Sequence, residues 1–163
     1  MVRYFKSILA SQYEASLCML NDCIQKCPER HWDGMIGKYP FWMVAYHTLC
    51  FADLYLSPSK KEWRARAIHP RGYKELVDER PSRRFEKGEM LEYAEFCRQK
   101  VGEAVEWETL SSLKGPSGFR WYKVTRGELH LINLRHISHH AGQLSAFLRR
   151  VEVKPRWVGS GWR

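Results

Sequence analysis

The sequence predicts an all-α protein, a four-helix bundle with a long crossover between its second and third helices. Three segments, 3–26, 89–107 and 126–151, carry apolar residues at the three- and four-residue spacing of an amphipathic helix. A fourth segment, 41–56, is apolar almost all round and too long for a typical strand, which predicts a buried helix. At 163 residues the chain is expected to form a single domain, 1–163, with its own core.

Proline and capping residues indicate where these helices begin and end. Pro28 stops the first helix, and Pro58 stops the second, because proline cannot continue the backbone hydrogen-bond ladder. Pro40 suits the first turn of the second helix. Thr125 and Glu128 have the spacing of a capping box, which predicts that the last helix starts beside them.

The sequence also predicts the structure of the segments that connect the helices. In the turn-rich loop after the first helix, Trp32 and Met35 are expected to pack onto the bundle. Residues 57–88 are broken repeatedly by proline and glycine and form the irregular crossover. The turn signal at 115–118 precedes a stretch expected to form a short extended segment. Residues 152–163 are expected to form a tail.

The composition indicates a folded cytoplasmic protein with reduced thiols. A hydrophobic fraction of 44% and an aromatic fraction of 13% are typical of a packed chain. No apolar run is long enough to span a bilayer and the N-terminus does not read as a signal peptide, so we expect a cytoplasmic location and no membrane partner. The five cysteines form no C-x-x-C pair, and their odd number favours buried free thiols.

The chain is basic, with a net charge of +9 at neutral pH. Such a charge suits a polyanionic partner, and the excess is concentrated in residues 58–88 and in the tail. No zinc finger, basic zipper or RNA-binding signature accompanies it. A solvated basic surface is therefore the favoured interpretation, with nucleic acid as a less favoured partner.

Three of the seven histidines fall within five positions of the last predicted helix. His136 and His140 are one turn apart on its apolar stripe, where two imidazoles can hold one metal ion if a third ligand comes from elsewhere. His47 lies in the middle of the apolar second helix and is the candidate for that third ligand. Three histidine ligands with an open fourth position form a known catalytic metal arrangement.

The sequence also predicts where the other histidines and Gln143 lie relative to these three. His139 lies off the shared face and is expected to face a neighbouring helix or the mouth of the site, although it could replace one ligand. Gln143 shares the face of His140, where it could donate a hydrogen bond within the metal site or make an ordinary bond between helices. The remaining histidines are expected on the surface: His31, His69 and His130.

Two sequence elements resemble the DinB/YfiT-like superfamily: Ala45-Tyr46-His47-Thr48-Leu49 and His136-x-x-x-His140-Ala141-Gly142-Gln143-Leu144. The resemblance extends to the helix order and the crossover, and so covers most of the chain. It implies an up-down-down-up bundle, often a homodimer, in which His47, His136 and His140 bind one divalent metal ion with water completing the shell. Zinc is the first candidate, followed by nickel, iron and manganese. The sequence departs from the family at Ala141, where arginine is common.

The resemblance implies a metal-dependent enzyme acting on a small-molecule substrate, with S-transferases that use a low-molecular-weight thiol among the relatives. A metal with a free position can activate either a thiol or a water molecule. Hydrolysis usually needs a carboxylate base, and none stands beside the helix-borne histidines, so the thiol reaction is favoured. The first alternative is a metal-dependent hydrolase. The second is a non-enzymatic stress-response or nucleic-acid-contacting protein with a structural metal site.

Overall fold

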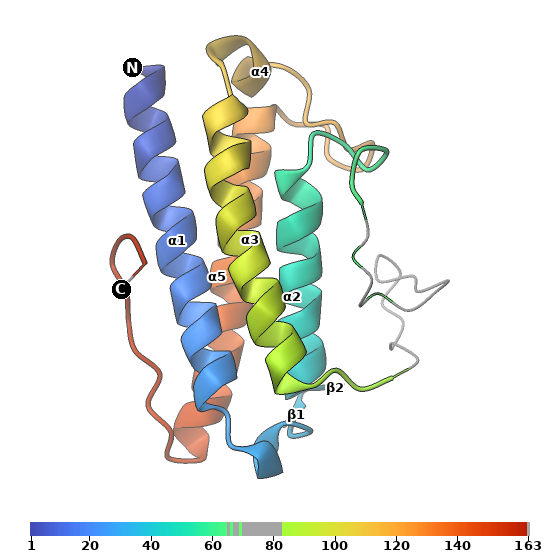
Figure 1. Cartoon of the computed structure of the whole chain (residues 1–163), viewed down its shortest axis with the longest axis vertical. Coiled ribbons are helices and arrows are strands. Elements are labelled where there is room, and N and C mark those ends of the chain that lie inside the picture. The colour runs from blue at the N-terminus through green and yellow to red at the C-terminus, as the bar shows by residue number, and fades with distance from the viewer. Residues whose placement is uncertain (65, 67–68, 70–82, 163) are drawn as a thin grey trace.

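Four long helices form a bundle in the computed structural model, which describes residues 1–64, 66, 69 and 83–162. They are α1 (Val2–Lys26), α2 (Phe41–Leu56), α3 (Lys87–Trp107) and α5 (Arg126–Arg150). Both α1 and α2 pack against α3 and α5, so each helix has two main neighbours. Figure 1 shows that α1 and α5 run in one direction and α2 and α3 in the other. The predicted four-helix bundle is confirmed.

The parallel course of α2 and α3 explains the long connection between them. Because both helices start at the same end of the bundle, the chain must return along its whole length after Leu56 (Figure 1). Much of this predicted crossover, 65, 67–68 and 70–82, lies outside the described residues. Its described part contacts the bundle, since the indole of Trp63 donates a hydrogen bond of 2.8 Å to Asp53.

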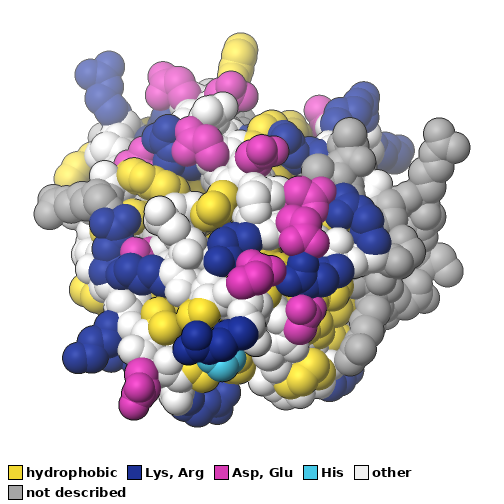
Figure 2. Space-filling view, turned by 60° about the horizontal axis from the view of Figure 1, so that its bottom comes forward, with side chains coloured by type: hydrophobic (Ala, Val, Ile, Leu, Met, Phe, Trp, Pro, Cys, Tyr) yellow, Lys and Arg dark blue, Asp and Glu magenta, His cyan; other side chains and the backbone are white. Residues whose placement is uncertain are grey.

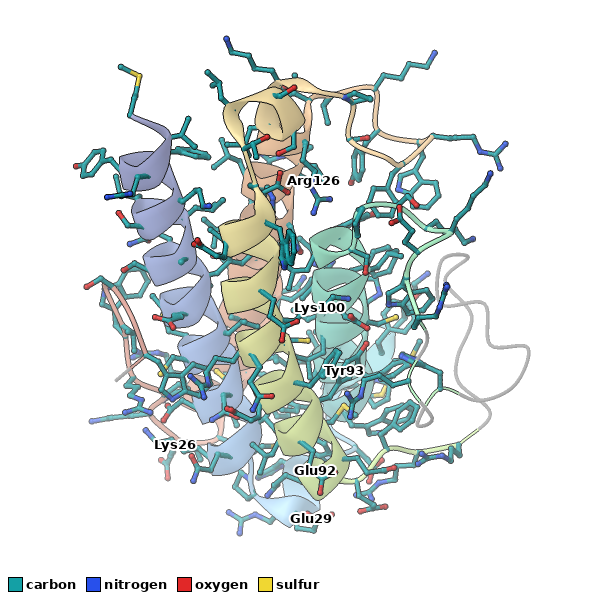
Figure 3. The ribbon with its side chains drawn as sticks, turned by 45° about the horizontal axis from the view of Figure 1, so that its top comes forward. Lys26, Glu29, Glu92, Tyr93, Lys100 and Arg126 are labelled. Atoms are coloured by element: carbon teal, nitrogen blue, oxygen red, sulfur yellow. The ribbon has the colours of Figure 1, made fainter. Side chains whose placement is uncertain are left out.

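Asp53 ties the crossover to α2 and α3. Its side chain is fully buried, and it accepts hydrogen bonds from Trp63 and, at 3.0 Å, from the hydroxyl of Tyr93. The ammonium of Lys100 pairs with the same carboxylate. Figure 3 shows Tyr93 and Lys100 on α3. A buried charge is tolerated only when it is paired and hydrogen-bonded, so this network holds a costly group in place.

His69 does not lie free on the surface, contrary to the prediction. It is half-buried between the hydroxyl groups of Tyr46 on α2 and Tyr93 on α3. Its Nε2 atom lies 3.3 Å from the Tyr93 oxygen, and burial lowers the pKa of the imidazole. The prediction failed because nothing in the sequence near His69 shows which helices the crossover covers.

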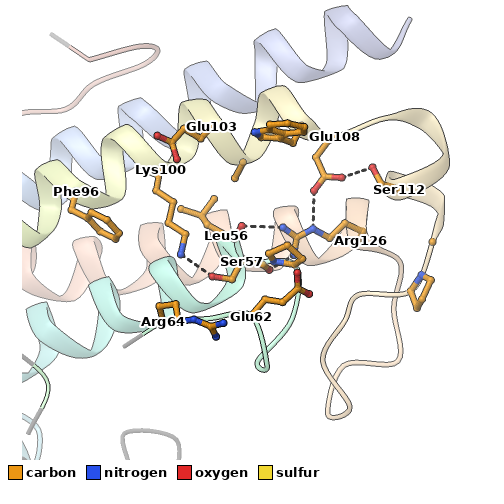
Figure 4. Close-up of a pocket in the computed structure, with 15 residues that line it drawn as sticks. Leu56, Ser57, Glu62, Arg64, Phe96, Lys100, Glu103, Glu108, Ser112 and Arg126 are labelled. Carbon is orange, nitrogen blue, oxygen red and sulfur yellow. Dashed lines mark hydrogen bonds and ion pairs between the residues drawn. The ribbon is translucent and has the colours of Figure 1, made fainter. Parts of the chain in front are cut away.

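A buried arginine, Arg126, caps the C-terminal end of α2. The guanidinium of Arg126 donates to the carbonyls of Tyr55 (3.0 Å), Leu56 (3.2 Å) and Ser57 (2.9 Å), as Figure 4 shows in part. Carbonyls in the last turn of a helix have no partner within the helix, so these bonds satisfy groups that would otherwise be unpaired. The Nε atom of Arg126 also donates to Glu108 at 2.8 Å.

His130 is also buried, with 1% of its surface exposed, although the sequence predicted a surface residue. Burial lowers its pKa, an effect that outweighs the opposing influence of Glu108. The neutral ring is therefore expected to donate from Nε2 to Glu108, at 3.0 Å. Its Nδ1 atom lies 3.2 Å from the hydroxyl of Tyr13 on α1. The prediction failed because the start of α5 is covered on two sides, by α1 and by the residues that follow α3.

Four short elements in the connections were not predicted. They are a 3-10 turn (Glu29–His31), the strands β1 (Met35–Ile36) and β2 (Tyr39–Pro40), and α4 (Leu110–Lys114). The two strands pair antiparallel. In the loop that contains them Trp32 is fully buried, as predicted, but Met35 is 49% exposed, which contradicts the prediction. The stretch after the 115–118 turn forms no strand, only an isolated bridge between Pro116 and Thr125.

The C-terminal tail packs against α1, and the cysteines lie in the protein interior. The backbone amides of Arg156 and Gly161 bond to Asp22 and Ser11, so the tail returns along α1. All five cysteines are buried and none forms a disulfide, which confirms the prediction of buried thiols. Within the described part of the chain, no helix combines the length and hydropathy needed to cross a bilayer.

Gly118 and Gly102 should respond in opposite directions to replacement by alanine. Gly118 has a φ of +84°, and a Cβ atom there would lie 2.0 Å from the Pro58 carbonyl oxygen. We expect Gly118→Ala to lower the free energy of unfolding by at least about 1–3 kcal/mol. Gly102 is exposed within α3 with open space around it, so Gly102→Ala should raise the same quantity by about 0.5–1 kcal/mol. Urea denaturation measures both, and equal effects would contradict the assigned turn.

Candidate metal centre

The three histidines singled out by their positions in the sequence meet between α2 and α5. His47 lies near the middle of α2, and His136 and His140 lie one turn apart on α5. The two helices pack along their length, which brings these rings together although almost ninety residues separate them in the chain. One nitrogen from each ring lies within 4.8 Å of the others. All three rings are half-buried.

The separations among the three histidine rings are compatible with binding to one metal ion. The Nε2 atoms of His47 and His136 are 3.2 Å apart. The ring centroids of His140 lie 4.9 Å from His47 and 4.5 Å from His136. Two nitrogens bound to one tetrahedral zinc ion at about 2.0–2.1 Å are about 3.3–3.4 Å apart. The His47–His136 edge therefore has the length that such an ion requires.

Burial keeps the imidazoles of His136 and His140 neutral. Burial lowers the pKa of His136 to about 2, and the neighbouring imidazoles act in the same direction. Burial also lowers the pKa of His140 to about 4, against a smaller opposing effect of its hydrogen bond with Gln143. A metal ligand must offer a lone pair, so both rings are in the protonation state that binding demands.

Gln143 fixes the orientation of His140. Its side-chain oxygen lies 2.8 Å from Nδ1 of His140, one turn away on α5. When Nδ1 carries the proton and donates to this oxygen, Nε2 keeps its lone pair for a metal. A hydrogen bond behind a ligating imidazole usually has this function. The sequence indicated the contact with Gln143 as a donor, but the structure places its side-chain oxygen, which can only accept, beside His140.

His139 stands outside the cluster. It is exposed, and its ring centroid lies 5.0 Å from that of His140. The side chains that approach one another closely enough to share an ion are His47, His136 and His140, without His139. The structure thus places His139 beside the group, as the helix periodicity predicted.

The donor set fits a divalent transition metal. Three imidazole ligands suit zinc, nickel, iron or copper better than calcium or magnesium, which prefer oxygen. Across the described residues, this trio is the one group of three or more histidine, cysteine or acidic side chains close enough to share an ion, and no carboxylate belongs to it. Phe51 lies 4.8 Å from His47 and 5.5 Å from His136 between ring centroids, so an apolar wall borders the group.

A cavity of about 610 Å³ lies elsewhere, between the end of α2, α3 and α4 (Figure 4). Its polar walls include Lys100, Glu108 and Arg126, all engaged within the protein: Lys100 bonds to Ser57 and Asp53, and Arg126 bonds to Glu108. None of the clustered histidines lines this cavity. Because donor chemistry rather than volume defines a metal centre, we place the candidate site at the histidines.

The charged surface does not gather into one basic patch on the face shown in Figure 2. There, Lys and Arg side chains lie among Asp, Glu and hydrophobic side chains. Arg84 illustrates the pattern, because it contacts Glu29 at 2.8 Å, Asp33 at 3.1 Å and Glu86 at 2.6 Å. These contacts lower the local excess of positive charge that a polyanion would need.

No protein-family model matches the sequence, and no curated protein matches it significantly. The likeness to the DinB/YfiT-like superfamily therefore rests on the two histidine-bearing motifs. The structure explains one departure from that pattern. Ala141 is 4% exposed, and its carbonyl oxygen lies 3.9 Å from the thiol of Cys23 on α1, so its position packs into the core and cannot accommodate arginine without rearrangement.

Proposed function

We propose that the protein binds one divalent metal ion through His47, His136 and His140. The observation that carries the proposal is the 3.2 Å separation of the His47 and His136 Nε2 atoms, with a third imidazole nitrogen within 4.8 Å of both. The donor set favours zinc, with nickel and iron as further candidates. The helix order and the position of the three ligands support a DinB/YfiT-like bundle.

The reaction that best suits this centre is transfer of a low-molecular-weight thiol to a small electrophilic substrate. A divalent ion supplies positive charge that lowers the pKa of a thiol. The chain holds three imidazoles toward one point, orients His140 through Gln143, and places the apolar ring of Phe51 beside His47. The absence of a carboxylate among the clustered groups of the described residues favours this reaction over hydrolysis, which usually needs a base.

Metal analysis tests the binding site. Purified wild-type protein should bind about one equivalent of zinc, whereas His47→Ala and His140→Ala should each lose most of it. Circular dichroism and urea unfolding of each variant show whether the bundle is intact. If a folded variant keeps a full equivalent of metal, the assignment of that ligand is wrong.

Thiol-dependent conjugation tests the reaction. Zinc-loaded wild-type protein is incubated with a low-molecular-weight thiol and an electrophile such as a chlorodinitrobenzene, and thioether formation is followed by absorbance. Activity above that of the metal-free protein and of His140→Ala supports the proposal. If the loaded protein instead hydrolyses an ester or amide probe and ignores the thiol, the hydrolase reading is correct.

A further inference from the structure

Two buried polar atoms on α5 have no hydrogen-bond partner among the described residues: Oδ1 of Asn133 and Nδ1 of His136. Asn133 is fully buried. Buried polar groups in native proteins are nearly always paired, so each of these atoms calls for an explanation. A carboxamide oxygen only accepts hydrogen bonds, and an imidazole Nδ1 that carries a proton donates one, so the two atoms are chemically complementary.

Their positions place the two residues on one face of the helix, although no direct hydrogen bond joins the two atoms in the structure. Residues three apart lie on one face of a helix, and helical side chains lean toward its N-terminus, so His136 extends over the turn that contains Asn133. The Nδ2 atom of Asn133 donates at 3.2 Å to the carbonyl of Ala52 on α2. This bond settles which end of the amide is the oxygen, because a flipped amide would place two acceptors face to face.

Binding of a metal creates a need for an acceptor at this point. The Nε2 atom of His136 points at His47, so it is the nitrogen available for an ion. A neutral ring that ligates through Nε2 must carry its proton on Nδ1, where a buried donor without a partner is costly. His140 meets the same need through Gln143, three residues further along α5.

We propose that Asn133 is the positioning residue for His136: when a metal is bound, its Oδ1 accepts the Nδ1–H of His136 after a small rotation of the two side chains, or one water molecule bridges the two atoms. The proposal rests on the metal centre proposed above. Asn133 and Gln143 then act as a pair, one on the N-terminal side of the ligands and the other on the C-terminal side. The bond from Asn133 to Ala52 also fixes the His136 ring relative to the helix that carries His47.

Two substitutions separate this role from packing. Asn133→Asp keeps an acceptor in place, whereas Asn133→Leu has a similar volume and offers none. Both lose the Nδ2 bond to Ala52, and Asn133→Asp also buries a carboxylate against that carbonyl, so Asn133→Asp should unfold at least as easily as Asn133→Leu. Weaker zinc binding in Asn133→Leu than in Asn133→Asp therefore cannot be explained by structural damage. We expect Asn133→Leu to raise the zinc dissociation constant by about 10–100-fold, and Asn133→Asp to stay within a few-fold of wild type or bind more tightly.

The measurements are zinc competition against a chromogenic chelator, the visible spectrum of the cobalt-substituted protein, and urea unfolding without metal. A cobalt spectrum altered in Asn133→Leu but not in Asn133→Asp supports the proposal. Equal affinities in both variants, whether unchanged or equally weakened, overturn it and leave the metal centre standing if wild type binds one equivalent. If wild type binds no metal, both proposals fall.

Discussion

Replacing Glu108 with alanine is expected to lower the free energy of unfolding by about 3–5 kcal/mol, because it leaves a buried arginine without its counter-charge. Glu108 and Arg126 are 8% and 6% exposed, and 2.8 Å separates the carboxylate from the guanidinium Nε. Arg126 is held by the last carbonyls of α2 and cannot leave without breaking those bonds as well. Urea unfolding at neutral pH measures the change.

Glu106 provides a matched control two residues away. Its side chain is 86% exposed and forms a 3.6 Å ion pair with Lys6. Exposed pairs contribute little because water and salt screen them, so Glu106→Ala should change the free energy of unfolding by less than about 1 kcal/mol. A loss in Glu108→Ala no larger than that in Glu106→Ala would show that the buried network contributes little to stability.

The loss of stability at acidic pH should also show the contribution of the Glu108 carboxylate. Burial raises the pKa of Glu108, but hydrogen bonds from His130, Arg126 and Ser112 outweigh this effect and hold the pKa at about 2, below the usual 4.5. A carboxyl with a depressed folded-state pKa contributes stability that is complete above its unfolded pKa and lost as the pH falls toward its folded pKa. Wild-type stability should therefore decline more steeply than that of Glu108→Ala between about pH 4.5 and pH 2.

The sequence predicted the bundle well because its four helices are specified locally. Apolar residues repeat at helical spacing in three of them, and proline marks the limits of the fourth, α2 (Phe41–Leu56). The capping box of Thr125 and Glu128 also forms as predicted, with the Thr125 side chain accepting from the Glu128 amide. Such signals depend on neighbours within a few residues, which the sequence contains in full.

The errors concern residues whose surroundings come from distant parts of the chain. His130 was expected on the surface, yet it bonds to Glu108 from the segment after α3 and contacts Tyr13 from α1. Met35 was expected to be buried but lies in a two-residue strand with half of its surface exposed. No local pattern reports such contacts. Lys100 was not singled out, although it neutralises the buried Asp53, because a lysine on an amphipathic helix usually faces water.

The three clustered histidines of the candidate metal site were predictable because the features that single them out appear in the sequence. His136 and His140 stand out by helical spacing, and His47 stands out as a polar residue in an apolar helix. The groups behind the ligands are harder to find. Gln143 was singled out because it shares the face of His140, whereas Asn133 was not singled out from the sequence. The significance of Asn133 comes from its own unpaired Oδ1 atom and the unpaired Nδ1 atom of His136, rather than from its spacing in the sequence.

Replacing His136 with alanine should weaken zinc binding far more than replacing His139. Loss of a hydrogen-bond partner behind a ligand already costs about 10–100-fold in affinity, and loss of a ligand removes a metal bond itself, so His136→Ala should raise the zinc dissociation constant by more than about 100-fold. His139 is exposed and outside the clustered nitrogens, so His139→Ala should change the constant by less than about threefold, or about 0.7 kcal/mol.

Chelator competition on the two folded variants decides between the two histidines, and the result bears on the helix register at the site. His136 and His139 differ by about 60° around α5, so exchanging their roles requires the helix to rotate relative to α2. Such a rotation would pull Asn133 away from Ala52, which it contacts at 3.2 Å. A large loss of affinity in His139→Ala, with His136→Ala close to wild type, would therefore contradict the packing of α5 on α2 as well as the choice of ligand.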